Sequence, residues 1–393
     1  MSKQHRSVDQ YSYPVSRIGI IGGGQLGRML VKSAKRLGCT CVVLDPTPGS
    51  PAGQVSGHQI LADSHDPEAL QQLAAQADVI TFDIEDIDAE MLARIAAAGH
   101  QILPSPSLLS EIQDKLRQKQ WLGRLGIPTA EFVEVDPADA EQFARFGYPL
   151  VQKARRGGYD GRGVVVMHSP ADAKQRLPVP SLIERFIPAA KELAVIVVRA
   201  QDGEVRSYEP VEMCFRAGEN ILDMLLAPAR IAAETATAAR RLAVETVTGL
   251  DGVGIFGIEL FLTEDGELLV NEVAPRTHNS GHYTIEACIT DQFEQHLRAI
   301  TGLPLGATDQ LIPAAMINLL GAPGESGPPV IRGLRAALAI PGVSVHFYGK
   351  AATRPFRKMG HVTVLDADIE AARRKAEQVR ALIEIGTETE SSA

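Results

Sequence analysis

The chain has 393 residues, 45% of them hydrophobic and 22% charged, which is ordinary for a globular protein and suggests two to three domains. Its net charge of −9 argues against a general binder of nucleic acid or anionic membranes, and no apolar run approaches a membrane span. The four cysteines form no C-x-x-C pair, so a disulfide framework or zinc site is not expected and a reducing cytoplasm fits.

The first hundred residues predict an α/β domain. Residues 1–16 are polar and rich in turn formers, without a signal-peptide pattern, and we predict a disordered tail. From Arg17, "RIGIIGGGQLGRMLVKSAKRLGCTCVVLD" alternates strand, glycine turn, helix and strand, and a later strand lies near Asp78 to Phe82. Such βαβ units form a parallel sheet, here expected to extend to about Pro106.

The glycine turn in this domain satisfies the dinucleotide-binding pattern. Gly22, Gly24 and Gly27 give G-x-G-x-x-G between a strand and a helix, and Asp45 ends the next strand. In NAD-binding proteins the glycines approach a pyrophosphate and the acid binds a ribose. A tightly packed helix N-terminus, or one that binds another anion, is the alternative.

The middle of the chain predicts an antiparallel α+β body. "SEIQDKLRQKQWLGRLGIP" predicts one helix that ends before Gly126 and Pro128, and short strands with glycine-rich turns follow. The segment "KARRGGYDGRGV", Lys153 to Val164, has four glycines and four cations between two strands, which suits a mobile phosphate-covering loop. It is not a Walker A loop, and a plain surface hairpin is the alternative.

A second candidate nucleotide feature is "LIERFIPAAKEL". Its edge strand, which carries Glu184, could offer its backbone to a purine, and Glu192 could accept ribose hydroxyls. The simpler alternative is that both carboxylates are solvated charges.

The segment "GIELFLTEDGELLVNEV" predicts a hairpin that opposes two acids. Asp265-Gly266 favours a two-residue turn, which pairs Leu262 with Leu269 and Glu259 with Glu272. Opposed carboxylates repel each other, and a hard cation such as Mg²⁺ would compensate while bridging to phosphates. The alternative places both acids on a solvated face.

The polar segment after this hairpin contains two histidines. His278 and His282 have the i, i+4 spacing of helical metal ligands, but Pro275, Asn279 and Gly281 predict a loop. We therefore expect substrate binding or loop stabilisation in preference to a transition metal. Beyond Gly306 the chain is rich in Pro and Gly, then recovers strands and ends in an amphipathic helix and a polar tail.

Taken together, these motifs resemble ATP-grasp ligases, and among them the 5-(carboxyamino)imidazole ribonucleotide synthetase family. The matching stretches are "IIGGGQLGRML", "QDKLRQKQWLGRLGIPTAEF", "KARRGGYDGRG", "NEVAPRTHNSGHYTIEACITDQFEQHLRAITGLPLG" and "MINLLG". The resemblance implies a Rossmann-like pre-ATP-grasp domain at 17–110, an ATP-grasp domain at 111–306 and a small β-rich C-terminal domain at 307–393. In this family the first domain binds substrate and not NAD.

The resemblance also implies roles for individual residues, with ATP and Mg²⁺ as cofactors. Residues expected at the nucleotide are Lys115, Lys153, Gly158, Tyr159, Asp160, Gly161, Arg162, Gly163, Val164, Glu184, Arg185, Phe186, Ile187, Glu192, Phe215, Asn271 and Glu272. Glu259 and Glu272 would hold Mg²⁺. Residues expected at the aminoimidazole ribonucleotide are Gly24, Gln25, Tyr159, Arg162, Lys350 and Arg357, with Asp160, Arg162, His278 and Asn279 as catalytic residues.

Two positions depart from the family pattern. Phe215 lies where the family has a histidine that approaches the nucleotide, beside a short insertion. The acidic strand end reads "FDIED" where the family has "FEFEN", which is a milder change.

The implied reaction carboxylates aminoimidazole ribonucleotide with ATP and bicarbonate, through carboxyphosphate, during purine biosynthesis. Asp160 and His278 are the candidate general bases. The partners are these small molecules, with neither nucleic acid nor membrane, and the family suggests a cytoplasmic homodimer. Competing hypotheses are a formate-dependent transformylase of the same superfamily, an NAD-dependent oxidoreductase and a non-catalytic nucleotide sensor.

Overall fold

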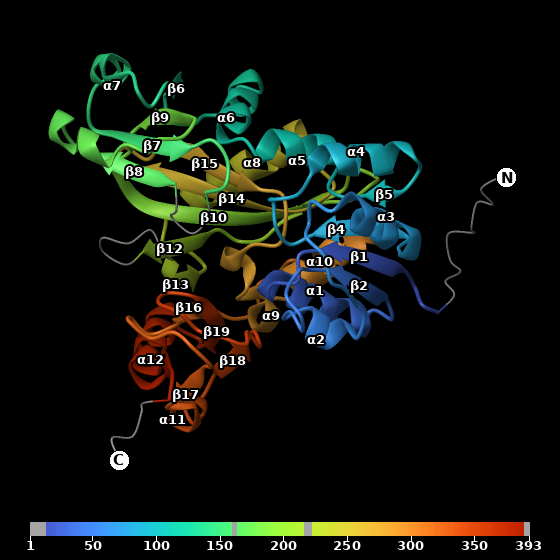
Figure 1. Cartoon of the computed structure of the whole chain (residues 1–393). Helices are drawn as coiled ribbons and strands as arrows, with labels where there is room; N and C mark the ends of the chain where they lie inside the picture. The colour runs from blue at the N-terminus through green and yellow to red at the C-terminus, as the bar shows by residue number, and fades with distance from the viewer. Residues whose placement is uncertain (1–12, 159–162, 216–221, 389–393) are drawn as a thin grey trace. The chain divides into compact units, whose positions relative to one another are not determined.

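The computed structural model describes residues 13–158, 163–215 and 222–388 of the chain (Figure 1). Internal contacts divide it into two compact units, Met1–Pro106 and Ser107–Ala393, which are considered separately below. Among the residues described, no helix has the length and apolar character needed to cross a membrane.

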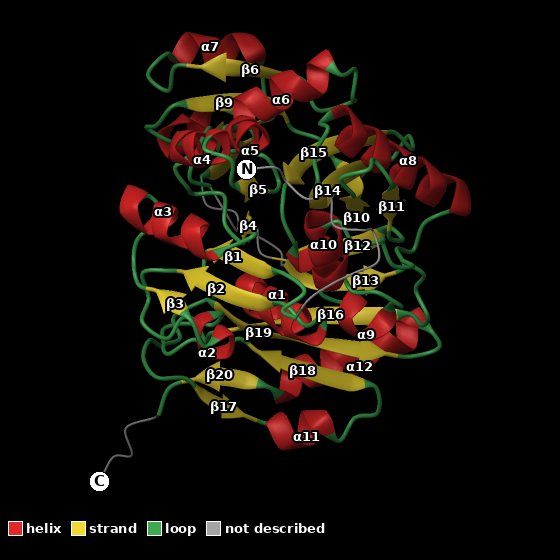
Figure 2. Cartoon of the chain, turned by 90° about the vertical axis from the view of Figure 1, so that its right-hand side faces the viewer, coloured by secondary structure: helices red, strands yellow, loops and turns green. Residues whose placement is uncertain are grey.

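The first unit is a parallel sheet with helices on both faces. The strand order is β3-β2-β1-β4-β5, with α1 and α2 on one face and α3 and α4 on the other (Figure 2). Four of the five residues of β1 and of β2 are buried, as expected for strands covered on both sides. The predicted parallel βαβ sheet is therefore confirmed. Its elements are β1 (Arg17–Ile21), α1 (Gln25–Arg36), β2 (Thr40–Leu44), α2 (Gly53–Ser56), β3 (Gln59–Ile60), α3 (Pro67–Gln76), β4 (Val79–Phe82), α4 (Ala89–Ala97) and β5 (Gln101–Ile102).

The described part of the chain begins slightly before β1. Most of the predicted tail, residues 1–12, lies outside the described residues. The Val15 amide donates to the Gly38 carbonyl at 3.0 Å, and the Thr40 amide donates to the Ser16 carbonyl at 3.0 Å. Val15 and Ser16, at the end of the predicted tail, therefore have backbone hydrogen bonds to residues beside and within β2, although β1 itself begins at Arg17.

The second unit begins with two helices, where the sequence predicted one. Helix α5 (Pro106–Ile112) ends before Asp114, whose carboxylate accepts from the Leu116 and Arg117 amides and so begins α6 (Lys115–Arg124). An N-cap needs an extended backbone, and Asp114 has φ −105° and ψ 108°. The prediction of a single helix was wrong because the capping role of Asp114 was overlooked.

A four-stranded antiparallel sheet follows, in the order β6-β9-β7-β8. Phe143, Leu150, Met167 and Ile183 form its small core. Its elements are β6 (Phe132–Val135), α7 (Ala140–Phe146), β7 (Leu150–Ala154), β8 (Val164–Met167), the 3₁₀ helix η1 (Pro170–Gln175) and β9 (Ser181–Arg185).

The rest of the unit is built on a nine-stranded sheet in the order β15-β14-β10-β12-β13-β16-β19-β18, with β11 beside β10. Strand β10 is buried on both faces: Leu193 and Val195 pack in the core under α8, and Ala194 and Ile196 pack in the core with α10. All named strand pairs of the second unit are antiparallel, as the sequence predicted.

The elements built around this sheet run from β10 to the end of the chain. They are β10 (Ala189–Arg199), β11 (Val205–Ser207), β12 (Val211–Phe215), β13 (Leu222–Ala227), α8 (Ala233–Gly249), β14 (Gly254–Thr263), β15 (Leu268–Ala274), η2 (Asn279–Gly281), α9 (Thr284–Ala287), α10 (Gln292–Thr301), β16 (Ala314–Leu320), β17 (Val330–Arg332), α11 (Leu334–Leu338), β18 (Val343–Phe347), β19 (Lys358–Leu365), α12 (Ile369–Leu382) and β20 (Glu384–Gly386). Because β13 pairs with β16, one sheet runs across the domain boundary expected at residues 306 and 307, and the domain limits stay predictions.

Candidate active site

The hairpin β14–β15 places Glu259 directly opposite Glu272, as the sequence predicted. The turn is not the predicted one, because the Thr263 amide donates to the Glu267 carbonyl and leaves a three-residue loop with Gly266 at φ +83°. Phe261, not Leu262, therefore pairs with Leu269. A bulge between these pairs and the acids gives β15 one extra residue, which restores the expected pairing of the two carboxylates.

Two opposed carboxylates need positive charge nearby, and a lysine supplies part of it. The Lys115 ammonium from α6 forms an ion pair with Glu272, whose side chain is 41% exposed. Burial alone would raise the pKa of Glu272, but Lys115, helped by Lys153 and His278, holds this pKa below its usual value. The pKa of Glu259 is raised, first by burial and then by the charges of Glu272 and Glu192. The ion pair of Glu272 with Lys115 and the burial of Glu259 disfavour the alternative of two freely solvated acids.

A second cluster of charges surrounds Glu184 on β9. Its side chain is 3% exposed, and its oxygens lie 2.9 Å from Lys153 Nζ and 3.4 Å from Lys119 Nζ. Burial alone would raise the pKa of Glu184, but Lys153 and Lys119 together hold it below its usual value. Glu184 is thus not a solvated surface charge. Lys119 was missed by the sequence analysis, although it lies one helical turn after Lys115.

Hydrogen bonds join these two clusters. Lys153 Nζ donates to Asn271 Oδ1 at 2.9 Å, and Asn271 Nδ2 donates to Glu259 Oε2 at 3.4 Å. Asn271 lies between Val270 and Glu272, where the bulge occurs. Glu192, two residues before the partner of Glu259 on β10, lies on the same face of the sheet, and burial raises its pKa. Cations and carboxylates therefore lie together in one site, which suits a polyphosphate and a hard metal ion.

The glycine-rich segment joins β7 to β8 as a hairpin loop. Lys153 pairs with Val164, and the Ala154 amide donates to the Gly163 carbonyl at 2.8 Å. Gly158 is at the near end of the loop, whereas the predicted residues Tyr159, Asp160, Gly161 and Arg162 lie outside the described residues.

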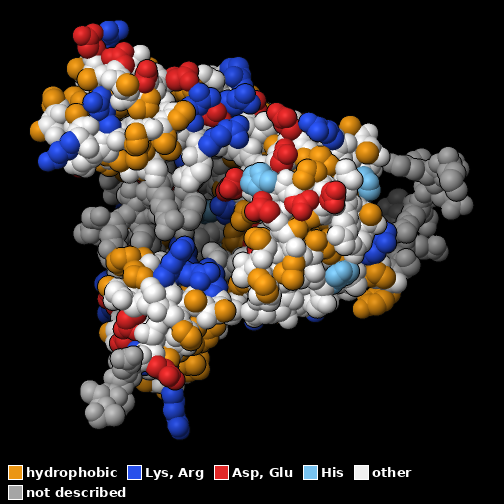
Figure 3. Space-filling view, viewed as in Figure 1, with side chains coloured by type: hydrophobic (Ala, Val, Ile, Leu, Met, Phe, Trp, Pro, Cys, Tyr) orange, Lys and Arg blue, Asp and Glu red, His pale blue; other side chains and the backbone are white. Residues whose placement is uncertain are grey.

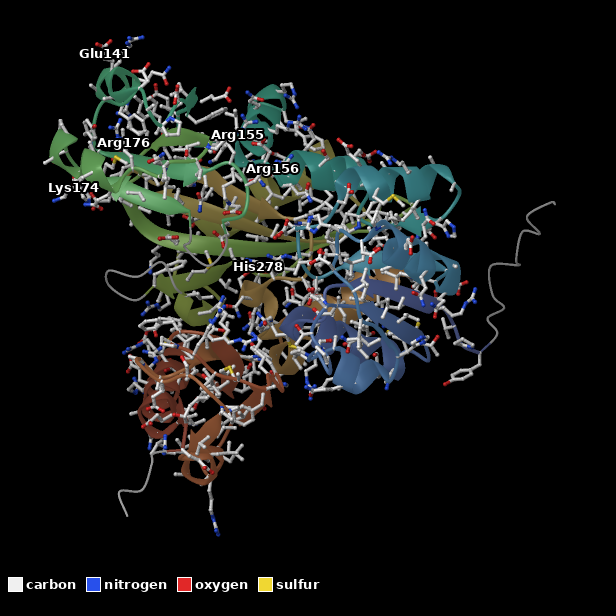
Figure 4. The ribbon with its side chains drawn as sticks, viewed as in Figure 1. Glu141, Arg155, Arg156, Lys174, Arg176 and His278 are labelled. Atoms are coloured by element: carbon white, nitrogen blue, oxygen red, sulfur yellow. The ribbon has the colours of Figure 1, made fainter. Side chains whose placement is uncertain are left out.

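The base of this loop is held by an ion pair. Arg155 Nη2 lies 2.6 Å from Asp114 Oδ2, and the Lys115 amide donates to the Arg155 carbonyl at 2.9 Å. Lys and Arg side chains gather over this part of the molecule (Figure 3), and Arg155 and Arg156 are labelled in Figure 4. Arg155 therefore fixes the start of α6, which carries the lysine that pairs with Glu272.

Other residues predicted at the nucleotide have structural contacts of their own. Arg185 lies 3.1 Å from Glu131 and stacks over the Phe146 ring at 4.6 Å. Phe186 makes an edge contact with the His168 ring at 5.7 Å. Phe215 ends β12 and packs against the core that contains Met213. The nucleotide roles of Arg185, Phe186, Ile187 and Phe215 remain predictions.

The segment after β15 directs His278 at the acid pair. His278 Nε2 lies 3.6 Å from Glu259 Oε1, and His278 Nδ1 lies 2.8 Å from Ser280 Oγ (Figure 4). The approach requires Gly257 on β14, because an added Cβ there would lie 2.7 Å from His278 Cβ. The His278 amide donates to Gln292 Oε1 at 2.9 Å, which ties the segment to α10.

His282 has a different environment. It is fully buried, its ring lies 4.6 Å from that of His361, and its Nδ1 is 3.3 Å from Gln292 Nε2. Burial holds the pKa of His282 well below its usual value. Of the two hypotheses for this residue, loop stabilisation fits better than substrate binding. Within the described ranges, no group of three or more His, Cys, Asp and Glu side chains is arranged to hold a metal ion.

The two cations predicted from the C-terminal part lie between β18 and β19. Lys350 Nζ donates to the Lys358 carbonyl at 2.7 Å, and Arg357 Nη1 donates to the Ala352 carbonyl at 2.6 Å. Burial, then the neighbouring Arg354, lowers the pKa of Arg357. The structure gives both residues backbone partners, and their substrate roles stay predictions.

In the first unit, carboxylates occupy the glycine turn that resembles a dinucleotide site. Asp45 Oδ2 accepts from the Gly23 amide at 2.7 Å, and Asp83 Oδ2 accepts from the Gly27 amide at 2.9 Å. These amides belong to the turn that would face a pyrophosphate in an NAD site, and two carboxylates would repel that group. The structure therefore favours the alternative of a packed helix N-terminus, which begins at Gly24 and Gln25.

The fold and the opposed acid pair with its lysines define the class of protein as an ATP-grasp ligase. Residues 15–113 match the model of the ribonucleotide synthetase preATP-grasp domain, residues 120–293 that of the ATP-grasp domain, and residues 314–375 that of the phosphoribosylaminoimidazole carboxylase C-terminal domain. More narrowly, the chain belongs to the N5-carboxyaminoimidazole ribonucleotide synthase family.

Relatives in bacteria and fungi support this assignment. The chain is 42% identical to the synthase of Synechococcus elongatus, over 89% of this chain and 90% of the relative. The structure of the Thermotoga maritima synthetase is similar with a TM-score of 0.89 and 50% identity, over 95% of this chain and 100% of that one. The Aspergillus clavatus synthase, described in complex with ADP and 5-aminoimidazole ribonucleotide, gives a TM-score of 0.86 and 37% identity, over 93% and 98%.

Some relatives are longer. The chain is 42% identical to the phosphoribosylaminoimidazole carboxylase of Ogataea methanolica, over 91% of this chain but 68% of that protein. It therefore spans about two thirds of such carboxylases.

Proposed function

We propose that this chain carboxylates 5-aminoimidazole ribonucleotide with ATP and bicarbonate, giving 5-(carboxyamino)imidazole ribonucleotide, ADP and phosphate. The observation that carries the proposal is the opposed pair Glu259 and Glu272, with Lys115 beside one acid and Lys153 joined to the other through Asn271. This arrangement supplies cations and oxygen ligands within one site, as phosphoryl transfer requires.

The nucleotide end of the site is proposed from these charges. Lys115 and Lys153 would neutralise phosphate oxygens of ATP, with the glycine-rich hairpin loop between β7 and β8 over them. Glu184 is buried between Lys119 and Lys153, so it fixes the lysine that approaches the phosphates as well as lining the proposed adenine pocket. Glu192 would accept ribose hydroxyls.

Magnesium fits the acid pair. Glu259 and Glu272 offer oxygen ligands, and Mg²⁺ normally completes its coordination with water and substrate phosphates. Bound there, it would supply positive charge to the phosphoryl group in transfer. The raised pKa of Glu259 supports this fit, because a cation would favour the ionised carboxylate that burial and Glu272 disfavour.

The chemical steps follow from the proposed reaction. A bicarbonate oxygen would attack the γ-phosphorus of ATP and release ADP, forming carboxyphosphate, whose breakdown gives carbon dioxide and phosphate beside the substrate amine. The amine would then form the new carbon–nitrogen bond and lose a proton. His278, 3.6 Å from Glu259, would lie close to this chemistry and is one candidate to accept that proton; Asp160 is the other.

The substrate residues are proposed from the family resemblance. His278 and Asn279 follow β15, and Lys350 and Arg357 lie between β18 and β19. Gly24 and Gln25 belong to the glycine turn of the first unit, and Tyr159 and Arg162 to the segment outside the described residues. We also propose a cytoplasmic homodimer, with the four free cysteines fitting a reducing compartment.

Release of ADP tests the proposal directly. Purified protein with Mg²⁺ and ATP should release ADP only when aminoimidazole ribonucleotide and bicarbonate are both added. Formate in place of bicarbonate is the control for a transformylase, and NAD fluorescence titration is the control for an oxidoreductase. ADP release that requires formate, or is indifferent to bicarbonate, would contradict the proposed function. Sedimentation velocity tests the dimer.

A further inference from the structure

A row of three polar side chains crosses the C-terminal strands of the large sheet. Asn318 on β16 pairs with His361 on β19, and His361 pairs with His346 on β18. Residues directly opposite one another in antiparallel strands point to the same face. The rings of His361 and His346 are stacked, with centroids 4.5 Å apart and an interplanar angle of 11°.

The segment that follows β15 presents a matching row. Asn279, His282 and Glu286 are spaced i, i+3 and i+7, the interval at which a helical path returns to one side, and they lie in or beside η2 and α9. Each meets one member of the sheet row. Asn279 pairs with Asn318, His282 lies with its ring centroid 4.6 Å from that of His361, and Glu286 Oε1 lies 2.5 Å from His346 Nε2.

These contacts are shielded from water. Asn318 is 8% exposed, and His282 and His361 are fully buried. Tyr348 adds a hydroxyl 2.9 Å from His361 Nδ1. Buried polar groups are costly unless their partners are correctly placed, so the Asn279–Asn318 and Glu286–His346 pairs favour this position of the segment relative to the sheet.

The two amides are oriented by a chain of hydrogen bonds. Asn318 Nδ2 donates to the Leu222 carbonyl at 3.0 Å and to Asn279 Oδ1 at 2.9 Å, so this end of Asn318 must be the nitrogen. Its oxygen then accepts from Asn279 Nδ2 at 3.1 Å. The direction of the Asn279 amide is thereby fixed, and each of its polar atoms retains capacity for one further hydrogen bond.

We infer that this row positions the segment that carries His278 and Asn279, and that Asn318 is the positioning residue that orients Asn279 toward the aminoimidazole ribonucleotide. The inference rests on the proposed function and adds a residue that does not itself contact substrate. Asn318 acts on the ribonucleotide through Asn279, while the ATP end of the site depends on Lys115 and Lys153, which lie on other elements.

Steady-state kinetics of Asn318→Ala, Asn279→Ala and the double variant tests this inference. We expect N318A to raise KM for aminoimidazole ribonucleotide roughly tenfold, about 1.4 kcal/mol, and to leave KM for ATP within about twofold. The double variant should resemble N279A alone, because Asn318 acts through Asn279. Thr363→Val, a nearly isosteric change at a buried position of β19, is the control and should leave both KM values within about twofold.

A purely structural role for Asn318 predicts different results. Equal changes in both KM values, a double variant whose effect is the product of the single effects, or an N318A enzyme within about twofold of wild type would overturn the positioning role. If N318A does not fold, Asn318→Asp carries the same test, since it keeps the volume and one acceptor but removes both donated hydrogen bonds. Wild-type protein that lacks ribonucleotide-dependent ADP release would instead overturn the proposed function, and this inference with it.

Discussion

Replacing Glu184 with Gln tests whether the buried charge cluster depends on its central carboxylate. The side chain is 3% exposed, and two ammonium groups lie 2.9 Å and 3.4 Å from its oxygens. At an effective dielectric constant near 20, each pair contributes roughly 5 kcal/mol of gross attraction, most of which offsets desolvation. The neutral amide would leave Lys119 and Lys153 buried without the carboxylate that lies nearest to both.

We expect Glu184→Gln to lower the free energy of unfolding by about 3–5 kcal/mol, the usual cost of breaking a buried ion pair. In a unit of this size that corresponds to a fall of roughly 10 °C in Tm. Differential scanning calorimetry measures it. Glu131→Gln is the matched control, because Glu131 pairs with Arg185 at 3.1 Å but is 65% exposed, and exposed pairs contribute about 1 kcal/mol or less.

A double variant tests whether the unpaired ammonium groups cause the loss of stability. Adding Lys119→Met to Glu184→Gln removes one of the unpaired ammonium groups and should recover part of the lost stability. The reasoning would be refuted if Glu184→Gln and Glu131→Gln shifted Tm equally, or if Lys119→Met made Glu184→Gln less stable.

Three further predictions concern the same site. Glu272→Gln should reduce kcat by roughly 10²–10³, because one of the two proposed charged metal ligands is lost, while Glu264→Gln at the hairpin turn should retain activity; full activity of the first variant would exclude the proposed metal role. Burial lowers the pKa of Lys119 to about 8, below its usual 10.5, so the unfolded chain binds this proton more tightly. Wild-type stability should therefore gain roughly 3 kcal/mol between pH 8 and 10.5 relative to Lys119→Met, and parallel urea-unfolding profiles for the two proteins would contradict this. Gly257→Ala should displace His278 and lower kcat/KM at least tenfold, whereas unchanged kinetics would show that the close approach is not needed.

In the hairpin that carries Glu259 and Glu272, the sequence predicted the pairing of the two acids but not the turn. The apolar segments on either side of Asp265-Gly266 predict a hairpin in which Glu259 lies opposite Glu272, and the structure confirms that pair. The predicted pairing of the two acids is correct because two differences from the predicted hairpin cancel. The loop has one more residue than expected, and the bulge adds one residue to β15. Local turn preferences do not determine a bulge, since its position depends on what packs against both strands.

The glycine turn and the charge cluster show the opposite case. The spacing of Gly22 to Gly27 is the same in a dinucleotide site and in a packed helix start, and only the approach of Asp45 and Asp83 distinguishes them. In the sequence Lys119 is one of several helix lysines, and only the fold shows that Glu184 on β9 lies beside it.

The sequence by itself determined the parallel and antiparallel units, the order of the motifs and the family they resemble, because these depend on local periodicity and on residue types near one another in the chain. The tertiary structure decided which charges meet. Asn279 and Asn318 are 39 residues apart, and Lys115 and Glu272 are 157 residues apart, yet each pair is in contact. Such pairing follows from strand order and burial, which leave each buried charge or amide only those partners that the folded chain brings within reach.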